Sequence, residues 1–320
     1  MKVIFAGTSS LLALPILNRI FFSNICQIVA VYTCPDRYAG RGKKLTISPV
    51  KQFASIYKIP IYQPSTFNNK IEIDLLEKLN CDVFISADYG IILPDTVLNI
   101  PKYGCINVHP SLLPKWRGAA PVQRAILAGD KITGISITKT SRNIDSGDIY
   151  KQSTLYIDND DTSVTLLKKL AILGAELLLD VLTELCNNNI TPVIQKEISK
   201  FPYAHKILKN EGYINWYESA YKISLMVRAF NPWPIAFTEI DDIFIKIWKV
   251  AVVEKKNREN ILPGTIIRVD KTGIEVVTGE GNIILLNIQL PNKTPLHVAD
   301  IINANNNILI VGKRMTNLKK

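Results

Sequence analysis

Residues 104–118 read Gly-Cys-Ile-Asn-Val-His-Pro-Ser-Leu-Leu-Pro-Lys-Trp-Arg-Gly, an apolar run that passes into a proline-rich turn. The composition of residues 104–108 predicts a buried strand. Side chains two residues apart on a strand point to the same side, so Asn107 and His109 can converge on one small carbonyl group. The amide would donate a hydrogen bond to that carbonyl, and the imidazole would handle charge or protons.

An isolated Asn-x-His pair is more often structural than catalytic. Three features favour a functional pair here. The chain contains only three histidines, His109, His205 and His297. The two polar side chains directly follow a run that should stay apolar in a buried strand. The segment after them is typical of a loop that holds a ligand.

The first half of the chain alternates strand-like and helix-like segments. Short runs rich in Val, Ile and Phe predict strands, whereas apolar residues at helical spacing predict helices. This alternation favours an α/β fold with a mainly parallel, Rossmann-like sheet covered on both faces. Ligands of such sheets bind beyond the carboxyl ends of the strands, where Asn107 and His109 would lie. The expected strands are 2–6, 27–33, 82–87, 104–108, 134–140 and 149–157, and the expected helices are 11–22, 49–57, 71–79 and 163–186.

The second half of the chain has a different pattern. Several short alternating runs, separated by glycine-containing turns such as Pro263-Gly264, predict a small antiparallel, OB-like β-barrel. The segment Asn187-Asn188-Asn189, followed by Thr191-Pro192, marks a boundary. We therefore expect a Rossmann-like domain over residues 1–188, a linker over 189–205 and the OB-like domain over 206–320.

Composition and cysteine usage narrow the class of protein. Apolar residues make up 47% of the chain and charged residues 21%, as in ordinary globular proteins. No secretory signal precedes the first expected strand, and no apolar run is long enough to span a bilayer, so we expect a cytoplasmic protein. The five cysteines form no Cys-x-x-Cys pair, so neither a disulfide framework nor a zinc site is indicated. Gly7-Thr8-Ser9-Ser10 lacks the Gly-x-Gly-x-x-Gly pattern of a nicotinamide enzyme.

The charge balance points to a polyanionic partner. The chain carries 38 basic and 28 acidic residues, a net charge of +10, although a codon bias that enriches Lys, Asn and Ile would contribute to this excess. The loop from Cys34 to Lys51 is strongly basic. Counting Arg37, Arg41, Lys43, Lys44 and Lys51 against Asp36 gives a net charge of +4. A solvated surface loop is one interpretation, but the length of the loop favours contact with nucleic acid.

These motifs together resemble the methionyl-tRNA formyltransferase family. The resemblance rests on residues 107–121, on Gly-Arg-Gly-Lys-Lys at 40–44, on Asp-Ser-Gly-Asp at 145–148 and on Arg-Ala-Phe-Asn-Pro-Trp-Pro at 228–234. It covers almost the entire chain, in order. The Ser-Leu-Leu-Pro segment is shared with other folate-dependent formyltransferases, whereas the basic loop and the Asn-Pro-Trp-Pro segment are more specific to the tRNA enzyme. Pro110 and Asp88 depart from the usual family residues without removing a catalytic group.

The resemblance implies roles for particular residues. Asn107, His109 and Asp145 are implied as the catalytic set, the first two stabilising an oxyanion and Asp145 orienting His109. The implied co-substrate is 10-formyltetrahydrofolate, with no metal, and the implied partner is initiator methionyl-tRNA, held also by the C-terminal barrel. The residues implied at the folate site are Tyr89, Gly90, Ile91, Ile92, Ser111, Leu112, Leu113 and Pro114. The residues implied in tRNA binding are Arg37, Arg41, Lys43 and Lys44.

Other functions remain open at this stage. A formyltransferase that acts on a nucleotide sugar or on glycinamide ribonucleotide would share the Asn, His and Asp set, but it would have little use for the basic loop. A catalytically silent RNA-binding protein would have no use for that set. We also expect a monomer, because no symmetric apolar surface is evident in the sequence.

Overall fold

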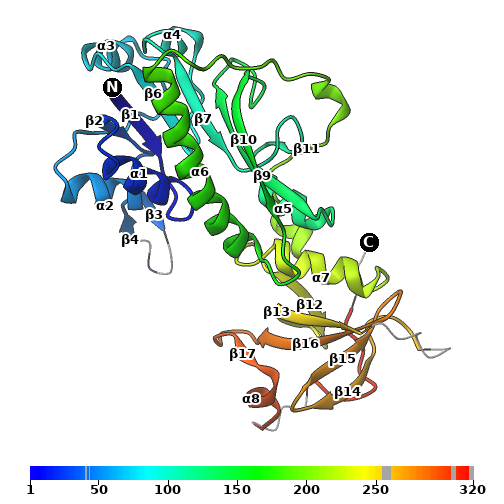
Figure 1. Ribbon diagram of the computed structural model, residues 1–320. Helices are drawn as coiled ribbons and strands as arrows, with labels where there is room; N and C mark the ends of the chain where they lie inside the picture. The colour runs from blue at the N-terminus through cyan, green and yellow to red at the C-terminus, as the bar shows by residue number, and fades with distance from the viewer. Residues whose placement is uncertain (40–41, 43, 254–260, 304–307, 317–320) are drawn as a thin grey trace. The chain divides into compact units, whose positions relative to one another are not determined.

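The computed structural model describes residues 1–39, 42, 44–253, 261–303 and 308–316 (Figure 1). The chain divides into two compact units. The first unit comprises Met1–Pro121, Ile132–Tyr156 and Thr165–His205, and the second comprises Val122–Lys131, Ile157–Val164 and Lys206–Lys320.

The first unit is built on one large sheet. Within the described residues its strands are β1 (Lys2–Gly7), β2 (Gln27–Tyr32), β5 (Ile61–Tyr62), β6 (Val83–Ala87), β7 (Cys105–His109), β9 (Ile132–Lys139) and β10 (Ile149–Tyr156). They lie in the order β10-β9-β7-β6-β1-β2-β5. The strands from β5 to β7 are parallel, and β9 and β10 are antiparallel to their neighbours. The predicted mainly parallel, Rossmann-like sheet is confirmed.

The order in which successive strands are added to the sheet reverses between β1 and β6. From β1 it builds outward to β2 and β5, and it then returns to β6 on the other side of β1 before it continues to β7. Ligands of open α/β sheets bind beyond the carboxyl ends of the strands near such a reversal. In the register of β6 and β7, Ser86 pairs with Asn107. Ser86 of β6 and Asn107 of β7 therefore lie side by side at the carboxyl ends of their strands.

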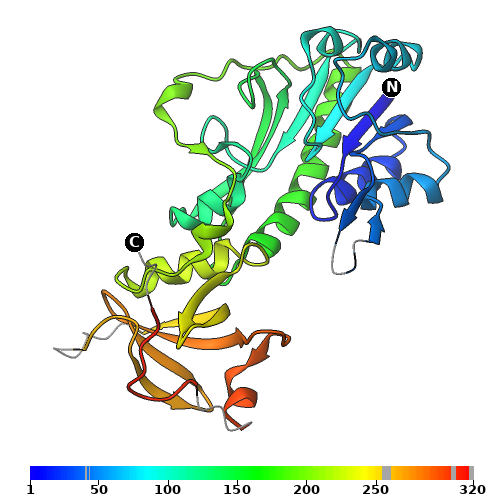
Figure 2. The same ribbon diagram turned by 180° about the vertical axis from the view of Figure 1, so that it is seen from behind.

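Helices cover both faces of this sheet (Figures 1 and 2). They are α1 (Ala13–Phe21), α2 (Pro49–Ile56), α3 (Lys70–Lys78), α4 (Asp95–Leu98) and α6 (Ser163–Cys186). Ile4 and Ala6 of β1 share one buried cluster with Leu76 of α3 and Val97 of α4. On the α6 face, a Cβ added to Gly174 would lie 3.2 Å from Val108 Cγ1. Burial on both faces explains why these strands read as continuous apolar runs.

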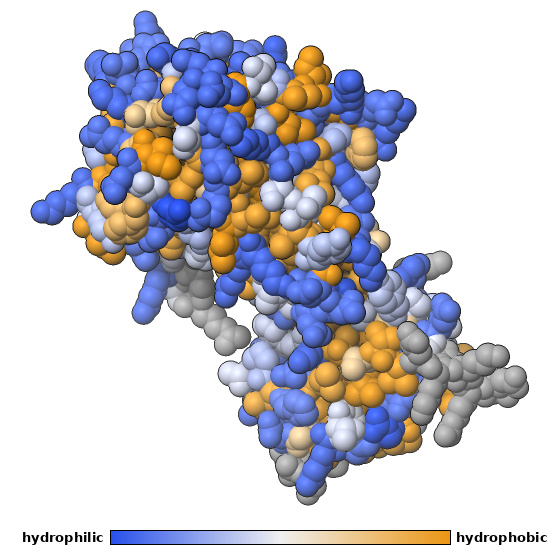
Figure 3. Space-filling view, viewed as in Figure 1, coloured by the Kyte–Doolittle hydropathy of each residue, from blue (hydrophilic) through white to orange (hydrophobic). Residues whose placement is uncertain are grey.

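Two helix features follow directly from the sequence. The Ser48 hydroxyl caps α2 by accepting a hydrogen bond from Lys51 N (2.9 Å), and Pro49 occupies the first turn. The longest helix, α6, shows apolar side chains on its outer face as well, and Ile172 is 67% exposed. Figure 3 shows apolar side chains among the polar surface on the face of this unit that carries α6. No helix in the described part of the chain is both long and apolar enough to cross a membrane.

Short strand pairs complete the first unit. Strands β3 (Arg37–Ala39) and β4 (Lys44–Thr46) form an antiparallel hairpin. Strands β8 (Arg117–Gly118) and β11 (Tyr203–Ala204) pair in parallel. A 3₁₀ helix spans Ile198–Lys200, and an isolated bridge joins Ile149 to Val193. The segment after α6 therefore packs along the first unit before the chain enters the second.

The second unit is an antiparallel sheet with helices. Its described elements are α5 (Pro121–Leu127), a 3₁₀ helix (Lys209–Gly212), α7 (Ala220–Ala229), β12 (Ala236–Ile240), β13 (Ile243–Val253), β14 (Ile266–Asp270), β15 (Gly273–Val277), β16 (Asn282–Gln289), β17 (Leu296–His297) and α8 (Val298–Asn303). The sheet order is β12-β13-β16-β15-β14, and β17 also pairs with β16. Trp216 is fully buried in the core, where its indole Nε1 donates to Thr238 Oγ1 (3.0 Å). The predicted antiparallel region is confirmed.

Candidate active site

Asn107, His109 and Asp145 lie together at the carboxyl end of β7. Asn107 and His109 are the last polar residues of that strand, and Asp145 lies in the loop between β9 and β10. Asn107 Nδ2 donates to Asp145 Oδ1 (3.2 Å), and His109 Nδ1 lies 3.5 Å from the same oxygen. The alternation of a strand places the two β7 side chains on one side. The structure thus brings all three predicted catalytic residues together.

The His109 ring is buried between two acceptors. It is 4% exposed, its Nδ1 faces the Asp145 carboxylate, and its Nε2 lies 2.9 Å from the main-chain oxygen of Trp116. A carboxylate and a carbonyl both accept hydrogen bonds and cannot donate them. A neutral imidazole carries one N–H and can satisfy only one of these partners, whereas the doubly protonated ring satisfies both. Each ring nitrogen of His109 therefore faces an acceptor, which fixes the orientation of the ring.

Asp145 is held at several points. Its Oδ2 accepts from Gly118 N (2.9 Å), while Oδ1 accepts from Asn107. Its backbone adopts φ 51°, in the left-handed region, which aspartate tolerates better than most residues. The carboxylate thus has a defined position between β7 and the main chain at Gly118.

The orientation of the Asn107 amide is fixed from both ends. Ser86 Oγ donates to Asn107 Oδ1 (2.9 Å), and Asn107 Nδ2 donates to Asp145. The opposite orientation would place the amide oxygen against a carboxylate. Because a primary amide has two N–H groups, Asn107 keeps a second donor for a substrate carbonyl.

The segment that follows β7 is fixed by a network of hydrogen bonds. Ser111 is fully buried, and its hydroxyl donates to Lys115 O (2.7 Å). Ser136 Oγ donates to Ser111 O (2.7 Å), and Leu113 N donates to Ser136 Oγ (3.0 Å). Gln152 Nε2 donates to Leu113 O (2.9 Å). These bonds occupy the Ser111 hydroxyl and the main chain of Leu113, so Leu112 and Pro114 offer a substrate mainly their side-chain surfaces.

The second predicted folate segment follows β6. Tyr89 is buried, and its main-chain oxygen already accepts from Cys34 Sγ (3.1 Å). Gly90 has φ 78° and open space around it, and Ile92 is 72% exposed. Both segments therefore start at the carboxyl ends of neighbouring strands, β6 for Tyr89–Ile92 and β7 for Ser111–Pro114.

The basic segment is a hairpin with an anchored base. Lys51 Nζ donates to Asp36 Oδ2 (2.6 Å), and Gln63 Nε2 donates to Asp36 Oδ1 and Cys34 O (both 2.8 Å). Hydrogen bonds from Lys51 and Gln63 lower the pKa of Asp36 below its usual value. Arg37 on β3 and Lys44 on β4 are exposed. Two further predicted tRNA contacts, Arg41 and Lys43, lie outside the described residues.

The position of Lys51 shows which charges of this segment are paired, and the net charge of +4 stays the same. The sequence suggests that Lys51 adds to the charge of the basic loop. In the structure its ammonium group pairs with Asp36 and also donates to Gln63 Oε1 (2.7 Å). Lys51 therefore anchors the base of the hairpin, and its charge is already matched by Asp36.

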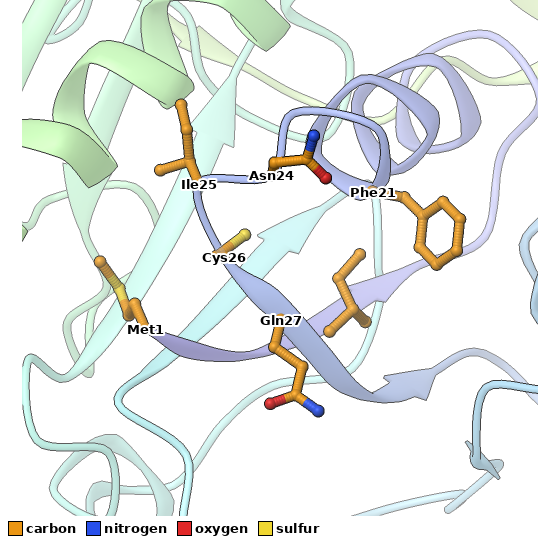
Figure 4. A pocket seen from close by; sticks show the side chains of 7 residues that line it. Met1, Phe21, Asn24, Ile25, Cys26 and Gln27 are labelled. Carbon is orange, nitrogen blue, oxygen red and sulfur yellow. The ribbon is translucent and has the colours of Figure 1, made fainter.

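A surface pocket elsewhere does not have the features of an active site. It has a volume of about 430 Å³ and is lined by Met1, Phe21, Asn24, Ile25, Cys26, Gln27 and Ile28 (Figure 4). It lies where β1 and β2 begin, at the edge opposite the carboxyl ends. Burial raises the pKa of the Cys26 thiol to about 11, so this sulfur is a poor nucleophile near neutral pH. No cluster of three potential metal ligands occurs among the described side chains.

Replacing Gly118 with alanine should disturb the Asp145 anchor. Gly118 has φ 114°, and an added Cβ would lie 2.7 Å from Ala204 O and from the Tyr203 ring. We expect the free energy of unfolding to fall by about 1–3 kcal/mol, as measured by thermal denaturation. Gly312→Ala is the matched control, because Gly312 has φ 90° but open space around it. Equal losses in both variants would rule out the steric explanation.

Comparison with known proteins identifies the family. Residues 1–182 match the family described as formyl transferase, and residues 206–306 match the formyl transferase C-terminal domain. A methionyl-tRNA formyltransferase of Coxiella burnetii (strain CbuK_Q154) is 44% identical over 313 residues, which cover 98% of both chains. The chain belongs to the formyl transferase family. The resemblance predicted from the sequence is thereby confirmed, and the chain is a formyltransferase.

Solved structures show the same fold. The N-formyltransferase from Helicobacter canadensis, in complex with folinic acid and dTDP-3-aminofucose, matches this formyltransferase with a TM-score of 0.65 at 20% identity, covering 89% of this chain and 98% of that one. HypX from Aquifex aeolicus, in complex with tetrahydrofolic acid, matches with a TM-score of 0.60 at 15% identity. That match covers 94% of this chain, which spans less than half (46%) of HypX. At these identities the likeness concerns the fold.

Two residues at the site were not predicted from the sequence. Ser86, which orients Asn107, looks like one small residue inside an apolar strand. Gln195, whose amide donates to Asp145 O (3.0 Å) and Gly147 O (2.7 Å), lies in the segment predicted to be a linker. The feature that distinguishes Gln195 is its burial between exposed neighbours. This burial is visible only in the structure, and no sequence pattern indicates it.

Proposed function

We propose that this formyltransferase transfers the formyl group of 10-formyltetrahydrofolate to the free α-amino group of methionyl-initiator tRNA. The product, N-formylmethionyl-tRNA, would serve translation initiation in the cytoplasm. The observation that carries the chemistry is the partly buried cluster in which Asn107 and His109 face one carboxylate oxygen of Asp145. The full-length relationship to a methionyl-tRNA formyltransferase supports the choice of acceptor.

The reaction needs no nucleophile from the protein. The attacking group is the α-amino group of methionine, and a free α-amino group has a pKa of about 7.7–8, so a useful fraction is neutral near pH 7. The barrier lies in the negative charge that forms on the formyl oxygen and in the departure of the folate nitrogen. We propose that the second N–H of Asn107 donates to that oxygen and that the His109 cation stabilises the same charge.

The contacts of His109 restrict its role in proton transfer. Nδ1 faces Asp145 and Nε2 faces Trp116 O, so the ring must exchange one of these contacts before it can donate a proton to the departing nitrogen. Electrostatic stabilisation requires no such exchange. We therefore assign His109 mainly to charge stabilisation and Asp145 to holding the ring in place. A water bound by Asp145 would be the simplest carrier for the proton of the amine.

For the folate donor, we propose the segments Tyr89–Ile92 and Ser111–Pro114. Much of the main chain at Tyr89 and Leu113 is engaged within the protein, so main-chain contacts with the donor would come mainly from Gly90–Ile92. Leu112 and Pro114 would provide apolar contact. The donor itself supplies the activated formyl group, and the reaction as proposed requires no metal.

For tRNA binding and catalysis, we propose that three consecutive segments of the chain have different roles. Residues 1–188 would form the catalytic domain, 189–205 the linker and 206–320 a tRNA-binding domain. Arg37 and Lys44 on the hairpin would contact the acceptor end of the tRNA, and so would Arg41 and Lys43, whose role rests on the sequence. We propose that the protein acts as a monomer.

Replacing Gln63 with leucine should weaken tRNA recognition without changing any charge. The variant removes the hydrogen bonds that fix Asp36 and Cys34 O at the base of the hairpin. We expect the KM for methionyl-tRNA to rise about 3- to 10-fold, since each lost hydrogen bond contributes about 0.5–1.5 kcal/mol. The KM for the folate donor should stay the same. Steady-state kinetics with each substrate varied in turn will measure both, and a rise confined to the folate KM would contradict the role of the hairpin.

A formyl-transfer assay with methionylated initiator tRNA and 10-formyltetrahydrofolate tests the proposed function directly. Filter binding should show saturable tRNA binding that weakens steeply with salt, because phosphate contacts release counterions. A dTDP-amino sugar is the informative competitor substrate, given the fold shared with sugar formyltransferases. Formyl transfer to the amino sugar with none to methionyl-tRNA would contradict the proposed acceptor and would identify an amino sugar as the substrate instead.

A further inference from the structure

Gln195 is a buried polar residue in an otherwise exposed stretch. It is 6% exposed, whereas its neighbours Val193 and Ile194 are 66% and 71% exposed. This is the reverse of the usual pattern, in which apolar side chains are buried and amides face water. A buried amide costs free energy unless it is hydrogen-bonded. The contacts of the Gln195 amide should therefore explain its position.

Those contacts all lie on the loop that carries Asp145. Nε2 of Gln195 donates to Asp145 O (3.0 Å) and to Gly147 O (2.7 Å), which uses both of its N–H groups. The amide oxygen of Gln195 has no hydrogen-bond partner among the described residues. The position of the Gln195 side chain is therefore explained by the two hydrogen bonds that its amide N–H groups donate. The reciprocal hydrogen bonds between Ile149 and Val193 (2.8 Å each) hold the backbone of this segment beside the loop.

The loop has features that require such support. Asp145 has φ 51°, and a Cβ added to Gly147 would lie 1.7 Å from Lys139 O, so the loop passes very close to the end of β9. Oδ1 and Oδ2 of Asp145 must at the same time reach Asn107 and Gly118 N. A small shift of the Asp145 backbone would move both oxygens away from these partners.

We propose that Gln195 is a positioning residue for formyl transfer, which holds the Asp145 loop so that the carboxylate stays in contact with Asn107, His109 and Gly118. The proposal rests on the proposed function, because it acts through the catalytic set assigned there. Gln195 itself touches the loop backbone, and it makes none of the contacts of the carboxylate. A purely architectural role, in which Gln195 only fixes the segment after α6, is the alternative that the experiment must exclude.

The test is a double-mutant cycle between Gln195 and Asp145. Gln195→Met keeps a long unbranched side chain and removes both donors. We expect kcat to fall by about 10²-fold, as misplacement of a catalytic group by about 1 Å does, with both KM values unchanged. In an Asp145→Ala background the same substitution should cause no further fall, because coupled residues are not additive. Full additivity of the two effects would show an architectural role and overturn the proposal.

Gln152→Met is the matched control. Gln152 also donates through Nε2 to two acceptors, Leu113 O (2.9 Å) and Ser136 Oγ (2.8 Å), but these lie on the proposed folate segment. This variant should raise the KM for the folate donor, and its effect should persist in the Asp145→Ala background. If Gln152→Met lost its effect there as well, the non-additivity of Gln195→Met would reflect a general collapse of the site and the proposal would fall.

A second variant serves if Gln195→Met does not fold. Gln195→Glu keeps the size of the side chain, and its protonated form retains one donor for the loop carbonyls. Its ionised form has no donor and faces two carbonyl oxygens. Its kcat relative to the unaltered enzyme should therefore fall as pH rises, and a ratio independent of pH would count against the proposal. Absence of formyl transfer by the unaltered enzyme would refute the proposed function, whereas an active enzyme with full activity in the Gln195 variants would refute only this inference.

Discussion

Formyl transfer by the His109→Ala variant is expected to be about 10²–10⁴-fold slower in kcat than transfer by the unaltered enzyme. The buried ring lies beside the Asp145 oxygen that also accepts from Asn107, and the proposed mechanism assigns it the stabilisation of charge. Its removal leaves the charge that develops on the formyl oxygen without a positive partner. Because His109 is buried and the exposed cations Arg37 and Lys44 are left in place, tRNA affinity should hardly change.

Single-turnover kinetics and filter binding separate these two expectations for His109. The first measures the chemical step, and the second measures initiator tRNA affinity without turnover. His205→Ala is a suitable control, because His205 is exposed and makes an edge contact with the Tyr203 ring at 4.9 Å between centroids. A His109 variant with normal single-turnover rates would remove the ring from the mechanism.

The second large effect is expected at Asn107. Asn107→Ala removes the N–H group assigned to the formyl oxygen, and loss of one such donor typically lowers kcat by about 10²–10³-fold. The binding of both substrates should change little, because this donor acts on charge that develops during the reaction. The measurement is kcat and both KM values with the folate donor and methionyl-tRNA.

A graded comparison makes the Asn107 prediction sharper. Ser86→Ala leaves both N–H groups of Asn107 in place and removes only the hydroxyl that donates to its Oδ1. It should therefore slow the reaction much less than Asn107→Ala. If Ser86→Ala were the more damaging change, the amide would matter for packing at the strand end, and its assigned role as a donor would be wrong.

Much of the fold could be predicted from the sequence because its elements are local. The expected strand at 104–108 and the expected helix at 49–57 correspond to β7 and α2. The hairpin β3–β4 was expected only as a loop, because each of its strands has only three residues. Strand β12 was not expected; it begins at Ala236, two residues after the Asn-Pro-Trp-Pro segment ends. Short elements depend on the partners they meet, and a single sequence does not show those partners.

From local sequence pattern alone, only the part of the site that lies on a single strand could be predicted. Strand alternation alone places Asn107 beside His109. The proximity of Asp145 was inferred from family resemblance, since 36 positions separate it from His109 and no local pattern joins them. Lys51 was counted with the basic loop because charge along a sequence does not reveal pairing. Gln195 was absent from the prediction because a lone glutamine near Asn and Pro residues is typical of a surface connection.

The parallel pair β8–β11 has a mechanical consequence. Gly118 and Ala204 are register partners, and Ala204 O also accepts from the main-chain N–H groups of Ala119 (2.8 Å) and Ala120 (3.2 Å). The polypeptide leaves the first unit for the last time at His205, one position later. Gly118 N is at the same time a donor to Asp145. A displacement of β11 is therefore expected to move Gly118 N as well, and with it the donor that holds the Asp145 carboxylate.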